Sequence, residues 1–102
     1  MKIVRVQYTV RQNFVRSNQQ NIAAVAEEVK SLGLKGIKYT AWLLPDGKTF
    51  MHFDQLESEA AHLALQDLPS FKKFAAELEA GGFESAPKME LVTLVASTEN
   101  YF

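Results

Sequence analysis

The sequence predicts one α+β domain over residues 1–102, with strands and helices in the order βαββαβ. A chain of 102 residues with 47% hydrophobic content can bury one core but has no room for a second. Segments with alternating apolar and polar residues are separated by segments with apolar residues at helical spacing. A Leu-Pro-Asp-Gly turn at 44–47 lies between two strand-like runs and predicts a central hairpin.

The first strand and the first helix are predicted by two different periodicities. Residues 2–10 alternate apolar with polar side chains, which is typical of a half-buried strand; the apolar ones are Val4, Val6, Tyr8 and Val10. Ser17 and Gln20 have the spacing of a capping box. The apolar residues that follow at helical spacing are Ile22, Val25, Ala26, Val29 and Leu32. Gly33 is the expected helix end.

The central hairpin is predicted from residues 37–44 and 49–54, which are rich in aromatic and branched side chains. The turn residues favour a type I turn with a glycine bulge, so that Leu44 opposes Lys48. In that register one apolar face holds Ile37, Tyr39, Ala41, Leu43, Met51 and Phe53 and packs on the helices. The opposite face carries Lys38, Thr40, Trp42, Phe50, His52 and Asp54.

The second half of the chain predicts two further helices and a last strand. Ser58 can cap a short helix that runs through Asp67. A second helix follows Pro69 and ends at the two glycines 81–82. Residues 89–96 are apolar enough for a final strand.

This order is that of the ferredoxin-like fold, a four-stranded antiparallel sheet with helices on one face. The other face of the sheet then has no cover within the chain. Trp42 and Phe50, beside Thr40, are too large and apolar for an open sheet, so we expect a homodimer packed sheet to sheet through these three residues. The alternative is a monomer whose tail folds across this face.

Composition excludes several functions. A net charge of −1 provides no general attraction to nucleic acid or to a membrane surface. The RNA-recognition fold shares the element order, but its aromatic motif is not evident in residues 2–10. The two histidines, His52 and His62, lack metal-ligand spacing, so no metal site is expected. The N-terminus lacks a signal-peptide core, which predicts a cytoplasmic protein.

Three segments carry a resemblance to a known family. Gly36-Ile37-Lys38-Tyr39, the run from Asp46 to His52 and the run from Leu68 to Phe74 resemble the dimeric α/β-barrel superfamily, especially small antibiotic-biosynthesis-monooxygenase-like proteins. The resemblance implies a homodimer whose two sheets form a barrel, with a ligand cavity between sheet and helices in each subunit. It also implies several chemistries, namely cofactor-free oxygenation, haem degradation and isomerisation.

Candidate site residues follow from their chemistry. His52 is expected to act as a general base with Tyr39 or Asp54 beside it, while Trp42, Asn21 and His62 are expected to bind the ligand. Each also has a purely structural interpretation, as a packing, capping or surface residue. Haem degraders of the superfamily use an Asn, a Trp and a His, residue types present as Asn21, Trp42 and His52, although Asn21 lies in the first helix. No cofactor is the expectation, and haem is the alternative.

The expected function is therefore a cofactor-independent monooxygenase or isomerase-like enzyme that acts on a small hydrophobic aromatic molecule. The alternative is a non-catalytic homodimeric module that binds a small ligand or assembles with other proteins.

Overall fold

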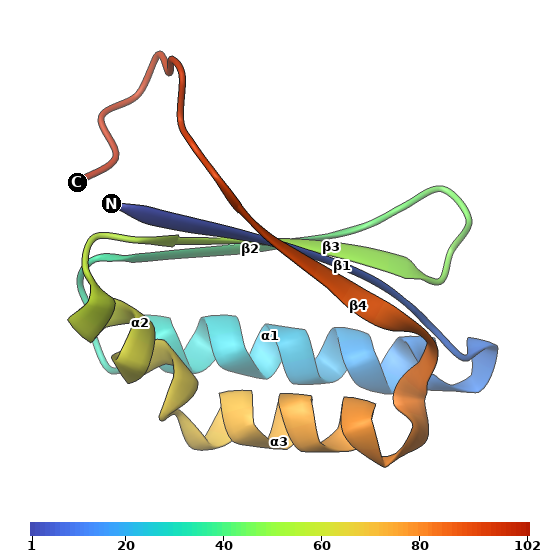
Figure 1. The fold of residues 1–102 in the computed structure, drawn as a ribbon. Helices are drawn as coiled ribbons and strands as arrows, with labels where there is room; N and C mark the ends of the chain where they lie inside the picture. Colours follow the sequence, from blue (N-terminus) through green and yellow to red (C-terminus); the bar gives the residue numbers. More distant parts are fainter.

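A four-stranded antiparallel sheet with helices on one face makes up the computed structural model, which describes residues 1–102 (Figure 1). The strands lie in the order β2-β3-β1-β4. The elements are β1 (Lys2–Val10), a 3-10 turn (Gln12–Phe14), α1 (Val15–Ser31), β2 (Ile37–Leu43), β3 (Thr49–Leu56), α2 (Glu59–Gln66), α3 (Pro69–Glu77), a π-helical turn (Leu78–Gly82) and β4 (Phe83–Val92). The predicted α+β architecture is confirmed. None of the helices combines the length and the apolar character needed to cross a membrane.

The core lies between the sheet and the helices, with α1 and α3 side by side beneath the strands (Figure 1). Its completely buried members include Val25 of α1, Leu65 of α2 and Leu56 of β3. Burying one such side chain stabilises the fold by roughly 1.5–3 kcal/mol. Each element therefore attaches to the sheet through its own apolar stripe.

The start of α1 differs from the prediction. The helix begins at Val15, and the Ser17 side chain forms no cap, because a 3-10 turn leads the chain into the helix two residues earlier. Phe14 of that turn packs so tightly on Gly82 that a Cβ there would lie 2.7 Å from the ring. The buried stripe of the helix also includes two polar residues, Asn18 and Asn21.

The two later helices follow their predicted signals. The Ser58 hydroxyl accepts a hydrogen bond from the Ala61 N–H at 3.2 Å, which caps α2 as predicted. Pro69 occupies the first turn of α3, where its missing N–H leaves no bond unmade.

The predicted register of the β2–β3 hairpin is wrong by one residue. Leu43 pairs with Phe50, and Tyr39 pairs with Asp54. The cause is the Asp46 side chain, whose carboxylate accepts hydrogen bonds from the backbone N–H groups of Lys48 and Thr49 at 3.0 and 2.8 Å. These bonds lengthen the loop, so pairing resumes at Leu44 and Thr49 rather than at Lys48.

The register decides which face each β3 residue occupies. Phe50, His52 and Asp54 face the helices, whereas Met51 and Phe53 face outward. Phe50 is 2% exposed and stacks on Tyr8 with ring centroids 5.8 Å apart, so its predicted role in a dimer interface is wrong.

The outer face of the sheet is only partly covered. Residues 93–102 turn back over one end of it (Figure 1), and the Lys38 Nζ lies 4.4 Å from the centroid of the Tyr101 ring. At the other end Trp42 is 56% exposed, next to the exposed Thr40. The tail therefore covers part of this face and leaves the predicted Trp42 anchor open.

The last strand begins earlier than the predicted residues 89–96. β4 starts at Phe83, directly after the glycine pair. Its pairing with β1 shifts between Gln7 and Thr9, where Ala86 and Pro87 lie opposite a single residue. A proline fits such a bulge on an edge strand because it has no N–H to donate. The residues around this proline are mostly polar, so the sequence pattern does not predict the first half of this strand.

Candidate functional site

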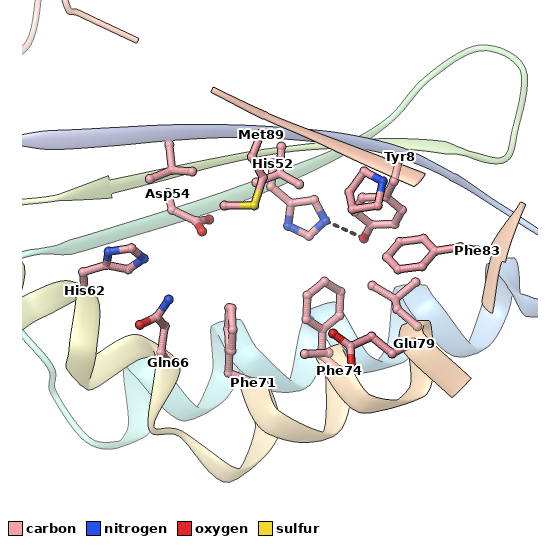
Figure 2. Close-up of a pocket in the computed structure, with 15 residues that line it drawn as sticks. Tyr8, His52, Asp54, His62, Gln66, Phe71, Phe74, Glu79, Phe83 and Met89 are labelled. Carbon is pink, nitrogen blue, oxygen red and sulfur yellow. Dashed lines mark hydrogen bonds between the residues drawn. The ribbon is translucent and has the colours of Figure 1, made fainter. Parts of the chain in front are cut away.

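A pocket of about 200 Å³ lies between the sheet and the α2–α3 layer (Figure 2). Its walls are mostly apolar; they include Val4, Val6, Phe71, Phe74, Leu78, Phe83 and Met89. Exposed residues of β4, Pro87 and Met89, line one side. A cavity in this position is what the resemblance implies.

Polar side chains enter the pocket from two directions. Tyr8, His52 and Asp54 come from the sheet, while His62, Gln66 and Glu79 come from the helical layer (Figure 2). Residues two apart in a strand share one face and lie roughly 7 Å apart along it. His52 and Asp54 of β3 are therefore neighbours that can contact two parts of the same small molecule.

His52 is held by a hydrogen bond inside the core. Its Nε2 lies 2.7 Å from the Tyr8 hydroxyl, which in turn accepts a hydrogen bond from the Asn18 amide at 3.0 Å. Burial lowers the pKa of His52 to about 4, since a charged imidazole would lose its water. The ring is therefore neutral at physiological pH, and its second nitrogen is turned toward the open space of the pocket (Figure 2).

Asp54 is a buried carboxylate with an unpaired oxygen. The residue is 7% exposed, and its Oδ1 has no hydrogen-bond partner. Burial raises the pKa of Asp54 to about 6. Its carboxyl group points into the pocket (Figure 2), so Asp54 is mostly ionised at pH 7 yet more basic than an ordinary carboxylate.

Tyr39 supports the site from behind. Its ring contacts the His52 ring edge-on with centroids 5.8 Å apart, and its buried hydroxyl has no partner. Burial, and then the Asp54 charge, raise the pKa of Tyr39 far above its ordinary value. Tyr39 does not line the pocket, and it stays protonated at physiological pH.

The structure separates the other predicted ligand-binding residues. His62 lines the pocket, with Nδ1 3.7 Å from the Glu59 carboxylate, and burial lowers the pKa of its ring. Asn21 lies outside the pocket and donates to Glu77 at 3.0 Å, which joins α1 to the end of α3. Trp42 lies on the outer face of the sheet, on the side away from the pocket.

Three important residues were missing from the predicted site. The sequence predicts Asp54 only as an outer-face neighbour of His52, predicts Tyr8 as core, and indicates no role for Asn18. A signal for the first was present, because polar residues at 52 and 54 interrupt an otherwise apolar strand. No group of three His, Cys, Asp or Glu residues is arranged to hold a metal ion.

Comparison with known proteins identifies relatives of the fold but not of the sequence. No family model matches the sequence, and no curated protein is significantly similar to it. Solved structures share the ferredoxin-like α+β fold of this chain, and one of them is described as an antibiotic biosynthesis monooxygenase. The predicted ferredoxin-like fold is thereby confirmed.

Three of these neighbours illustrate the similarity. A crystal structure described as an antibiotic biosynthesis monooxygenase has a TM-score of 0.78 and 12% identity, over 94% of this chain and 100% of that one. Rv0793 from Mycobacterium tuberculosis has a TM-score of 0.78 and 12% identity, over 96% and 98% of the two chains. PA3566 from Pseudomonas aeruginosa has a TM-score of 0.76 and 16% identity, over 93% and 94%. At these identities the similarity establishes the fold.

Proposed function

We propose that this protein is an enzyme that removes a proton from a small hydrophobic aromatic molecule and acts as a cofactor-independent monooxygenase. The observation that carries the proposal is Asp54, an unpaired carboxylate with a raised pKa in an apolar pocket, beside a neutral His52. A group whose pKa lies near the working pH is a suitable general base. The fold shared with a protein named as an antibiotic biosynthesis monooxygenase supports the reaction class.

The size and lining of the pocket support an aromatic substrate. A cavity of about 150 Å³ holds a benzene molecule. The pocket here has about 200 Å³ and opens beside β4, so it suits one or two fused rings. Phe71, Phe74 and Phe83 offer ring faces and edges for such a molecule.

The proposed reaction begins with proton transfer to Asp54. A phenol loses its O–H proton to the carboxylate, while the N–H of neutral His52 donates to the phenolate oxygen. The ring carbon para to that oxygen then gives an electron pair to O₂, and a C–O bond forms. Loss of the C–H proton and cleavage of the O–O bond leave a quinone and one water, which contains both protons. For 1-naphthol, the products are 1,4-naphthoquinone and water.

This assignment changes the expected role of His52. With a pKa of about 4 its imidazole is a weak base, so it serves as a hydrogen-bond donor to developing negative charge. Asp54 takes the role of base. Tyr39 packs behind His52 and does not reach the substrate.

The small size of the pocket supports a reaction without haem. Sites for drug-sized ligands have volumes of roughly 300–1,000 Å³, whereas this one has about 200 Å³. The Nε2 of His52 is hydrogen-bonded to the Tyr8 hydroxyl, which leaves only Nδ1 facing the pocket. We therefore retain the reaction without a cofactor.

A homodimer completes the proposal. Trp42 lies exposed on a sheet face that no helix covers, and the outward side chains of Met51 and Phe53 continue the apolar surface. Packing two such faces together would remove this surface from water.

Oxygen uptake tests the proposed function. Purified protein is incubated with 1-naphthol or anthrone at pH 7.5, and O₂ consumption is compared with quinone formation. We expect one O₂ consumed per quinone formed, and loss of this turnover in Asp54→Asn but not in Glu79→Gln at the pocket rim. Binding of these probes without turnover would favour the non-catalytic ligand-binding module. Absence of binding at millimolar concentration would contradict both.

A further inference from the structure

Three side chains form a hydrogen-bonded chain from α1 through the core to the pocket. Asn18 is completely buried, and its Nδ2 donates to the Tyr8 hydroxyl oxygen at 3.0 Å. The Tyr8 hydroxyl lies 2.7 Å from Nε2 of His52. These two hydrogen bonds are the only ones that the three side chains make, and the Oδ1 of Asn18 has no partner.

The direction of these bonds determines where the imidazole proton lies. A tyrosine hydroxyl has a single hydrogen, and its oxygen already accepts from Asn18. The second lone pair of the oxygen could accept from an Nε2–H group, but the Tyr8 hydrogen would then have no acceptor inside the core. Nε2 is therefore the acceptor of this hydrogen. A neutral imidazole with an accepting Nε2 carries its proton on Nδ1. The Nδ1–H group is then the one that faces the pocket (Figure 2).

We propose that Asn18 is a positioning residue that acts through Tyr8 to hold His52 in its Nδ1–H tautomer, so that the pocket selects ligands with a carbonyl or phenolate oxygen. The selectivity deepens the proposed function and rests on the same pocket. The tautomer itself is a property of the ligand-free protein and does not depend on any reaction.

The place of Asn18 in the helix supports this role. It lies one turn before Asn21 and two turns before Val25 on the buried stripe of α1, where apolar side chains would avoid the desolvation of an amide. The hydrogen bond that the amide donates to Tyr8 offsets part of that cost. An aspartate of the same shape would accept from Tyr8 instead.

Reversing the hydrogen bond between residue 18 and Tyr8 should also reverse the hydrogen bond between Tyr8 and His52. If residue 18 accepts the Tyr8 proton, the Tyr8 oxygen must accept from His52, and the imidazole proton moves to Nε2. The pocket then presents the Nδ1 lone pair, which repels a carbonyl oxygen. Asn18→Asp tests this reversal, and Asn18→Leu removes the donor with little change in shape.

Nitrogen NMR of the ligand-free protein reads the tautomer directly. Imidazole labelled with ¹⁵N gives distinct shifts and coupling patterns for the two forms. We expect the Nδ1–H form in the wild type, the Nε2–H form in Asn18→Asp and a mixture in Asn18→Leu. Tyr8→Phe removes the donor to Nε2, is also expected to give a mixture, and serves if the Asn18 variants do not fold. An Nε2–H wild type, or the same tautomer in every variant, would overturn the inference.

Binding of a matched pair of ligands reads the selectivity. 1-Tetralone has one carbonyl oxygen, and tetralin has the same rings without it. We expect the wild type to bind 1-tetralone about tenfold more tightly than tetralin, the effect of one hydrogen bond. This ratio should vanish in Asn18→Asp, while the tetralin affinity of that variant stays unchanged, and it should shrink in Tyr8→Phe. Equal loss for both ligands would indicate a merely structural role and contradict the proposal.

The two proposals fail in different ways. If the wild type shows the Nδ1–H tautomer and the tetralone preference but no oxygen uptake with 1-naphthol, the proposed function fails and the role of Asn18 stands. If oxygen uptake occurs with the Nε2–H tautomer, the role of Asn18 fails and the proposed function stands.

Discussion

The two faces of β3 differ in burial and in the ionisable residues that they carry. The inward face carries Phe50, His52, Asp54 and Leu56, all buried, and two of them can ionise. The outward face carries Met51, Phe53 and Gln55, which are only partly buried. The ionisable residues of this strand thus lie inside, between the apolar Phe50 and Leu56, rather than on the more exposed outward face. This placement indicates a site, because burial of an ionisable group destabilises a fold and persists where function requires it.

The largest expected effect is on catalysis. Asp54→Asn should lower kcat/KM for the quinone-forming reaction by about 10²–10⁴, the contribution typical of a general base. The same variant should raise the free energy of unfolding at pH 7.5 by up to about 3 kcal/mol, because it removes a buried charge whose pKa is displaced by roughly two units. Denaturant unfolding and oxygen uptake measure the two effects. A variant that is neither more stable nor less active would contradict the role of Asp54.

A matched pair of variants tests which face each aromatic residue occupies. Phe50→Ala should destabilise the fold by about 3–5 kcal/mol, since it empties a site in the core. Phe53→Ala, three residues further along, should cost about 1 kcal/mol or less in the isolated fold. Urea unfolding of the two proteins makes the comparison. The reverse order would support the register predicted from the turn residues, and equal effects would contradict the placement of Phe50 alone in the core.

The pH dependence of stability tests the burial of Asp54 and His52. Asp54 binds its proton more tightly when folded, so its contribution favours the fold below pH 3.8 and is lost as the pH rises through about 6. His52 binds its proton less tightly when folded, so its contribution is present above pH 6.5 and is lost as the pH falls through about 4. The two contributions oppose each other, and stability should change little between these limits.

Single variants should separate the two contributions. Asp54→Asn leaves only the histidine, and the free energy of unfolding should then fall by about 3 kcal/mol between pH 6.5 and pH 4. His52→Gln leaves only the carboxyl group, and stability should then decrease as the pH rises over the same interval. Tyr39 stays protonated, and His62 and Glu79 at the pocket edge are common to all three proteins. Parallel curves for the wild type and both variants would contradict the assigned burial of the pair.

The smallest effect concerns the outer face. Trp42→Asp should weaken association of two chains by more than about 2 kcal/mol, because a charge would be desolvated at an apolar interface. The monomer should remain folded, since Trp42 contributes nothing to the core cluster. Sedimentation measures the association, and far-UV circular dichroism measures the fold. A wild type that sediments as a monomer at micromolar concentration would contradict the homodimer.

Much of the fold could be predicted because its signals are local. The order of elements, the Ser58 cap and the Pro69 helix start depend on residues adjacent in sequence, and all three are observed. Trp42 and Thr40 lie on the outer face, as expected. The register of β3 could not be predicted, since it depends on two backbone hydrogen bonds to the Asp46 side chain that add one residue to the loop.

The site was predicted less well than the fold because it joins residues that are distant in sequence. The chemistry of His52 alone makes it a candidate, but its face and its role both depend on the register. The partnership of Asn18, Tyr8 and His52 brings together α1, β1 and β3. No spacing in the sequence indicates such a contact. The role of Asn18 in the buried stripe of α1 can therefore be inferred only from the structure.

The most direct test of the central claim is a carboxyl ¹³C NMR titration of the ligand-free protein. Asp54 should titrate with a pKa of about 6, and this resonance should be absent from Asp54→Asn. A signal from Asp54 that titrates near 3.8, its ordinary value, would mean that the carboxylate is solvated or paired. The pocket would then lack its base, and the proposed reaction would lose its support.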